Sequence, residues 1–223
     1  MSDTLLAKKK KNTANAWGVF FFFVLIVIDL VTKLVADVYF AMPNAREEIT
    51  LIPGVAVLRM VYNRGISFGV GSGASMAVKL SVLIGTGVLM LLFSIVFFRL
   101  DSRRKFLRVA LVLVIAGGIG NLIDRLYYQV WDPNSYQGGF RDGVRDMVDL
   151  TFSFIGFSAV CNLADFWITF GAGVLILALL FFDRDAMFPV GKYKAMAKAH
   201  EEETEKAKAA KAERKEKKTE NNG

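Results

Sequence analysis

The chain is poor in the residues that build most catalytic and metal sites, because its 223 residues include one cysteine and one histidine. A single cysteine, Cys161, excludes an internal disulfide, so cysteine usage says nothing about the redox compartment. We interpret Cys161 as a small buried apolar residue. His200 lies in the charged C-terminal part, so no Cys-His or Ser-His pair and no histidine cluster is expected. The sequence therefore predicts neither a metal nor a cofactor.

Apolar residues, by contrast, are abundant and clustered. They make up 54% of the chain and include 19 phenylalanines, which is too apolar for an ordinary soluble domain. Four windows, residues 17–38, 78–98, 106–128 and 158–182, each supply about 20 residues, or roughly 30 Å of helix. We expect an all-α membrane protein of four transmembrane helices, the first of them uncleaved, since no small-x-small cleavage site follows it.

The distribution of charge argues against a nucleic-acid partner. The net charge is +7, but the basic residues fall into three separate clusters, at residues 8–11, 99–108 and from 184 onward. The segments 39–77 and 129–157 carry few basic residues. By the positive-inside rule, both termini and the 99–108 connection are expected in the cytoplasm, and the two long segments outside.

The outward segments and the tail have distinct compositions. Residues 49–60 are rich in Val, Ile and Leu around Pro53-Gly54, which predicts short strands and a small extracytoplasmic sheet. The segment 129–157 begins with turn-forming residues and ends in aromatics suited to the headgroup region. We expect residues 1–182 to form the membrane domain, and residues 183–223 to form a charged tail that is either a solvated helix or disordered.

The pattern Asn-Leu-x-Asp occurs twice, ending at Asp124 and at Asp165. The helix rise places Asp124 about 6 Å and Asp165 about 10 Å from the outward ends of the third and fourth predicted helices. The asparagines Asn121 and Asn162 lie three residues earlier, on the same helical face. Two adjacent carboxylates cannot both ionise cheaply, so they share one proton and offer an acid and a base together. This pair is the predicted catalytic site.

Other charged residues have structural interpretations. Asp29 and Lys33 are one turn apart in the first helix and are interpreted as an intramembrane ion pair. Arg125 and Asp149 are expected to form a second pair that orients Asp124 or closes the third helix on the fourth.

Five short motifs, taken in order, resemble the bacterial lipoprotein signal peptidase family, also called signal peptidase II. They are Asp29-x-x-Thr32-Lys33, Asn63-x-Gly65-x-x-Phe68, Gly120-Asn121-x-x-Asp124-Arg125, Val148-Asp149 and Asn162-x-Ala164-Asp165. Each is weak alone, but the ordered set across residues 29–165 is specific.

The resemblance implies an intramembrane aspartyl endopeptidase of the bacterial inner membrane, with its active site on the extracytoplasmic side. It implies removal of signal peptides from prolipoproteins that bear a diacylglyceryl-cysteine, with membrane lipids as the other partners and a monomer as the working unit. The resemblance maps the catalytic dyad onto Asp124 and Asp165. The substrate-contacting positions it implies are Asn63, Gly65, Asn121, Arg125, Asn162 and Ala164, and the supporting ones are Asp29, Lys33 and Asp149.

Three other readings of the residues remain open at this point. A proton-coupled transporter also uses intramembrane Asp and Lys, but it predicts polar residues along the full membrane depth, whereas residues 171–182 are uncharged. A non-enzymatic scaffold would not need two carboxylates at matched depth. A presenilin-like protease would carry Gly-x-Gly-Asp, and here Gly118-Ile119-Gly120 precedes Asn121.

Overall fold

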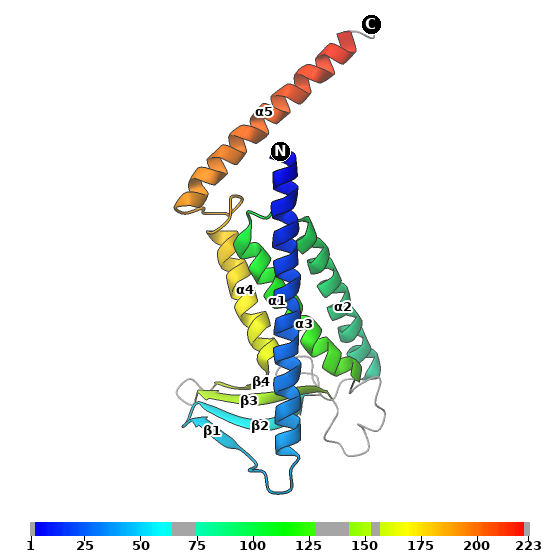
Figure 1. Ribbon diagram of the computed structural model, residues 1–223, viewed down its shortest axis with the longest axis vertical. Coiled ribbons are helices and arrows are strands. Elements are labelled where there is room, and N and C mark those ends of the chain that lie inside the picture. Colours follow the sequence, from blue (N-terminus) through cyan, green and yellow to red (C-terminus); the bar gives the residue numbers. More distant parts are fainter. Residues whose placement is uncertain (1–2, 64–74, 128–142, 153–156, 221–223) are drawn as a thin grey trace.

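The computed structural model describes residues 3–63, 75–127, 143–152 and 157–220. Its helices are α1 (Asp3–Phe40), α2 (Met76–Arg99), α3 (Lys105–Arg125), α4 (Leu163–Leu180) and α5 (Lys192–Glu220). Within the described residues, the first four are long and apolar enough to cross a membrane, which confirms the predicted spans. Figure 1 shows these four helices as a bundle with a small sheet at one end and both termini at the other.

Helix α3 is the centre of the bundle. The buried share of its span is 61%, against 17%, 11% and 17% for α1, α2 and α4. Its glycines allow this close packing, since a Cβ at Gly117 would lie 2.3 Å from the carbonyl oxygen of Ala164 on α4. The other three helices keep large apolar side chains exposed, such as Phe23, Leu91 and Phe170, as expected for surfaces that face lipid.

The sheet is antiparallel, with strands in the order β1-β2-β3-β4: β1 (Ile49–Ile52), β2 (Ala56–Asn63), β3 (Val144–Phe152) and β4 (Phe157–Cys161). The first two strands confirm the expectation for residues 49–60. Strands β3 and β4 were not predicted, because the turn-forming residues nearby dominated the reading of that segment. The hydroxyl of Tyr62 on β2 donates a hydrogen bond to the carboxylate of Asp37 on α1. This contact connects the sheet to the helix bundle.

The fourth membrane helix begins later than predicted, at Leu163 instead of residue 158. Residues 158–161 are extended and pair with β3, where Val148 lies opposite Cys161. Asn162 then closes a capping box with Asp165, which starts the helix. Residues 158–161 therefore form a half-buried strand, with Ala159 and Cys161 facing inward, rather than the first turn of a helix.

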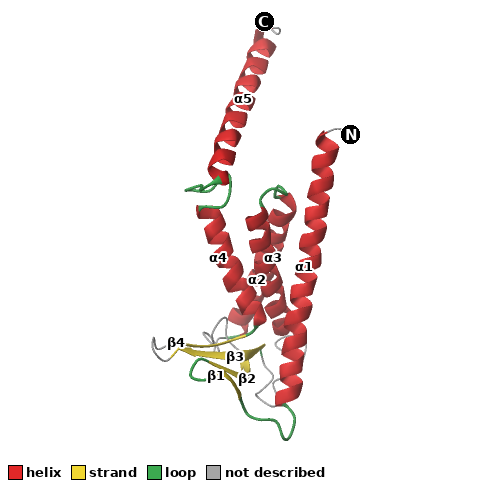
Figure 2. Cartoon of the chain, turned by 60° about the vertical axis from the view of Figure 1, so that its left-hand side comes forward, coloured by secondary structure: helices red, strands yellow, loops and turns green. Residues whose placement is uncertain are grey.

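The end of the bundle opposite the sheet carries the charged elements. Figure 2 shows α5 extending away from the bundle on this side, so the tail is a helix in the structure. Arg104, just before α3, donates to Asp183 and Asp185 after α4. These contacts join the α2–α3 connection to the segment that leads into α5.

Candidate active site

Strand β3 contacts the ends of α1 and α3, and β4 leads directly into α4. Polar side chains of α1, α3, β3 and the start of α4 converge there. The short link from β4 through Asn162 into α4 puts the start of that helix beside β3. Asp146, on β3, and Asp165, in the first turn of α4, are the two carboxylates that this arrangement brings to the same place. The remaining residues of the site are described from these two outward.

Asp165 is held by the capping box at the start of α4. Its backbone N–H donates to Oδ1 of Asn162 (3.1 Å), and its Oδ2 accepts from the Asn162 backbone N–H (3.1 Å). Its other oxygen, Oδ1, accepts from the side-chain amide of Asn121 at 2.8 Å. These donors hold the carboxylate in place at the start of the helix, beside the positive end of the helix dipole. Asp165 is only partly buried, so one side of it is accessible.

Asp146 is 1% exposed and sits between two amides. The side-chain nitrogen of Asn162 donates to Oδ1 at 2.6 Å, and that of Asn63 donates to Oδ2 at 3.0 Å. Burial, and after it the negative charge of Asp165, raise the pKa of Asp146 to about 7, although both amides and Lys33 act in the opposite direction. The carboxyl group is thus poised to hold a proton near neutral pH.

Asn121, on α3, connects the two halves of the site. Its Oδ1 accepts from the side chains of Asn162 (3.0 Å) and Lys33 (3.1 Å), while its nitrogen donates to Asp165. The Asn121 amide therefore orients Asn162, Lys33 and Asp165 together.

Asp124 lies in a buried ion cluster behind this network. The Lys33 ammonium is 2.8 Å from Asp29 and 3.3 Å from Asp124. The guanidinium of Arg145 is 2.7 Å from Oδ1 of Asp124, and the Arg145 backbone N–H donates to Oδ2 at 3.1 Å. The cluster balances two cations against two carboxylates, which is how intramembrane charges are retained.

Asp29 also fixes the start of α4 against α1. Its Oδ1 accepts from the backbone N–H of Ala164 at 2.9 Å, one of the first-turn N–H groups that have no partner within the helix. Gly120 on α3 makes room for this contact, since a Cβ there would lie 2.6 Å from Oδ2 of Asp29. Three helices therefore meet at one carboxylate.

The structure assembles most of the residues singled out from the sequence. Asp165, Asn121, Asn162, Asn63, Asp29, Lys33 and Ala164 belong to one connected network. Arg125 is within electrostatic range of Asp165, Asp146 and Asp124. Gly65 and Phe68 lie outside the described residues. Asp149, expected to pair with Arg125, forms an ion pair with Arg59 of β2 at 2.7 Å.

The sequence analysis missed Asp146 and Arg145. Asp146 lies in the segment 129–157, which was interpreted only by its turn-forming and aromatic residues. The signal that could have found it is the β-prone run Val144–Phe152, which places Asp146 on a strand near the second Asn-Leu-x-Asp motif. The contacts of Asp124 described above occupy both of its oxygens, and among the described residues none of them joins Asp124 to Asp165.

The arrangement brings together carboxyl groups that can act as acid and base. No group of three His, Cys, Asp or Glu in the described ranges could hold a metal ion. Cys161 hydrogen-bonds to the carbonyl of Val148, and burial raises the pKa of its thiol to about 12, so it is no nucleophile at neutral pH.

Comparisons with known proteins identify the family of this chain. The sequence model of the family described as Signal peptidase (SPase) II matches residues 21–181. A lipoprotein signal peptidase of Fusobacterium nucleatum is 32% identical over 167 residues, which cover 74% of this chain and 87% of the relative. One from Symbiobacterium thermophilum is 34% identical over 163 residues, covering 72% and 92%.

A solved structure described as a bacterial membrane enzyme has a TM-score of 0.57 and 25% identity to this chain, and the match covers 74% of this chain and 88% of that one. The architecture of four membrane helices with a small sheet is thus shared with an experimentally determined membrane enzyme. From the family match and these relatives, the chain belongs to the signal peptidase II family of membrane proteases.

Proposed function

We propose that this protein is a membrane aspartyl endopeptidase that removes signal peptides from lipid-modified prolipoproteins, with Asp146 and Asp165 as its catalytic pair. The substrate class follows from the relatives, which are lipoprotein signal peptidases. The observation that carries the catalytic assignment is the bridge by Asn162, which contacts both carboxylates at the sheet end of the bundle.

This pair departs from the Asp124–Asp165 pair expected from the sequence. Asp124 is 0% exposed and forms ion pairs with Lys33 and Arg145, which favours a structural role for this carboxylate. Burial and the negative charge of Asp165 raise the pKa of Asp146 to about 7. Such a value is expected for one member of a carboxylate pair that shares a proton. The environments of the two candidates therefore support different roles.

The chemistry assigned to the pair is general acid–base hydrolysis. The Asp165 carboxylate accepts a proton from a water molecule, and the water oxygen attacks the carbonyl carbon of the scissile peptide. Protonated Asp146 donates its proton to the carbonyl oxygen, which gives a neutral tetrahedral diol. Collapse of the diol returns a proton to Asp146, and the leaving amine takes the proton from Asp165, so both groups regain their starting states.

The position of the site suits a substrate anchored in the membrane. The pair lies where the apolar helices end and the sheet begins, so a peptide at the membrane surface could reach it while its lipid stays among acyl chains. We assign the sheet end to the extracytoplasmic side of the bacterial inner membrane and both termini to the cytoplasm, because the basic clusters gather at the opposite end. We take the working unit to be a monomer.

The test is cleavage by the full chain, purified in detergent, of a prolipoprotein that carries diacylglyceryl on its cysteine. The same prolipoprotein without the lipid is the control. We expect a single cut directly before the modified cysteine, identified by product mass, and no cut in the control. Folded protein that cuts neither substrate, or both equally, would overturn the proposal.

A further inference from the structure

An apolar groove runs between α1 and α3 near the end of the bundle opposite the sheet. Its volume is about 490 Å³, within the range of small-molecule sites. Trp17, Phe21 and Val109 on its rim are each more than half exposed, so the groove opens toward the surrounding membrane. The lining also includes Leu25, Phe97, Lys105 and Arg108.

Two basic residues, Lys105 and Arg108, line this groove. The Arg108 guanidinium already donates hydrogen bonds to Asn15 and to the carbonyls of Phe97 and Leu100. Lys105 is exposed, and within the described part of the chain no acidic residue forms an ion pair with it. It is also the first residue of α3, where no side chain caps the helix start, so the helix dipole adds to its positive charge.

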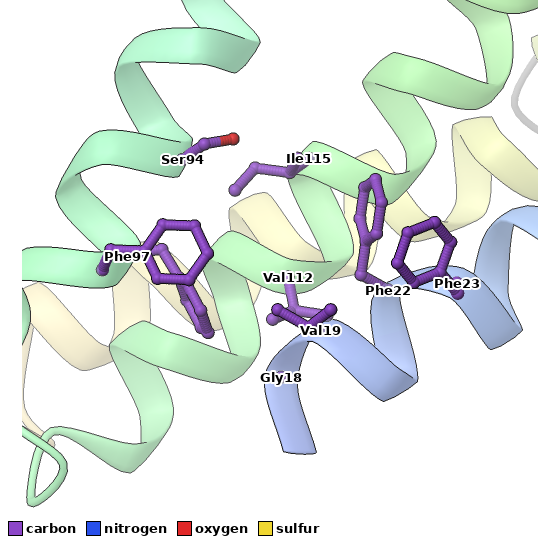
Figure 3. A pocket seen from close by; sticks show the side chains of 9 residues that line it. Gly18, Val19, Phe22, Phe23, Ser94, Phe97, Val112 and Ile115 are labelled. Carbon is purple, nitrogen blue, oxygen red and sulfur yellow. The ribbon is translucent and has the colours of Figure 1, made fainter. Parts of the chain in front are cut away.

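A neighbouring cavity shows what the groove has in addition. A second space of about 220 Å³ lies between α1, α2 and α3. Figure 3 shows the side chains from these helices that line it, with Phe97 on one side and Phe22 and Phe23 on the other. Gly18 lets the Phe97 ring approach α1, since a Cβ there would lie 2.2 Å from the ring, and Phe97 lines both spaces. The smaller cavity is lined by apolar residues and Ser94, without a charged side chain. Only the larger groove combines an apolar channel with a cation.

We propose that the groove binds an anionic glycerophospholipid of the leaflet opposite the sheet, with one acyl chain along Trp17, Phe21 and Leu25 and the phosphate at Lys105. Basic pockets between membrane helices on this side are suited to anionic headgroups, each basic residue contributing about 1 kcal/mol. A second copy of the chain would bring its own basic clusters to the same end and meet like charge. The proposal does not depend on the catalytic assignment.

The experiment measures lipid retention by native mass spectrometry of the full chain in neutral detergent. The probes are phosphatidylglycerol and phosphatidylcholine with identical acyl chains. We expect tighter binding of phosphatidylglycerol, and Lys105→Ala should weaken it about fivefold, the factor that corresponds to about 1 kcal/mol. Binding of phosphatidylcholine should not change in this variant.

Two matched controls separate the groove from its surroundings. Arg99→Ala removes a cation at the same end of the bundle that does not line the groove, and should leave phosphatidylglycerol binding unchanged. Val109→Phe should fill the groove and reduce retention of both lipids, whereas Val88→Phe, at an exposed position of α2, should not.

Equal losses in Lys105→Ala and Arg99→Ala would overturn the proposal, because they would indicate general attraction to a basic surface. So would equal binding of the two lipids by the wild type. A change of oligomeric mass in Val109→Phe would assign the groove to a second copy of the chain instead.

Discussion

Asn162 donates a 2.6 Å hydrogen bond from its side-chain nitrogen to Oδ1 of Asp146. The same asparagine caps α4 through its reciprocal bonds with Asp165. Asn162 therefore has two roles: it caps the start of a membrane helix, and it contacts both carboxylates of the proposed active site.

Replacing either proposed catalytic carboxylate should abolish cleavage without unfolding the protein. We expect Asp146→Asn and Asp165→Asn to lower the rate on lipidated substrate by about 10²- to 10⁴-fold, the usual contribution of a general acid or base. Asp149→Asn is the matched control, since Asp149 lies on the same strand and pairs with surface-exposed Arg59. Its rate should stay close to that of the wild type.

Asp124→Asn distinguishes the two possible pairs. If Asp124 supports the fold, the variant should be less stable, because Lys33 and Arg145 lose a buried partner, while each folded molecule still cuts. Thermal unfolding and the rate per folded protein are measured together. A stably folded variant with no activity would instead support the Asp124–Asp165 pair expected from the sequence.

The raised pKa of Asp146 predicts a specific dependence of stability on pH. The folded state, with a pKa of about 7, holds the proton more tightly than the unfolded state, with the ordinary value of 3.8. This contribution is therefore fully present below pH 3.8 and is lost as pH rises through about 7. When pH is raised from 5 to 8, the midpoint temperature of thermal unfolding should fall further for the wild type than for Asp146→Asn. Parallel curves for the two proteins would contradict the assignment.

Substitutions at Asn162 should separate helix capping from positioning of the carboxylates. Serine is a good N-cap but cannot donate to both Asp146 and Asn121, so Asn162→Ser should keep most of the stability and lose activity. Asn162→Ala loses both functions and should destabilise the protein by about 1 kcal/mol more. Unfolding midpoints and cleavage rates are compared, and equal stability of the two variants would argue against the capping role.

Lys33→Met should be among the most destabilising single changes. It leaves Asp29 buried beside Asp124 without the shared cation, and breaking a buried ion pair in this way costs about 3–5 kcal/mol. Lys79→Met on α2, where no ion pair is found among the described residues, is the control and should unfold like the wild type. Denaturant unfolding in detergent measures both.

Gly120→Ala tests the junction of α1, α3 and α4. A methyl group there would crowd Asp29 and lie 3.3 Å from Cβ of Ala164, and overpacking of this kind costs about 1–3 kcal/mol. Gly173→Ala on α4 places the same methyl group in open space and should leave stability unchanged or raise it. Similar unfolding midpoints for the two variants would show that the junction tolerates the added volume.

Several features of this protein follow from local sequence alone. Four long apolar segments, basic clusters confined to one side of the predicted membrane and the β-branched residues 49–60 predicted the membrane helices and the first two strands, because helix length, charge and strand propensity act over short stretches. The paired motifs likewise marked Asn121, Asn162 and Asp165 as site residues before their contacts were known.

Only the tertiary structure decided which carboxylate faces Asp165. Asp124 and Asp146 are both acidic residues near the outward ends of apolar segments, and spacing along the chain cannot distinguish them. The pairing of β3 with β4 carries Asp146 to Asn162, while Lys33 and Arg145, from distant segments, occupy Asp124. The environment of a carboxylate depends on groups brought together by folding, so the role proposed for each carboxylate rests on contacts that the linear sequence does not contain.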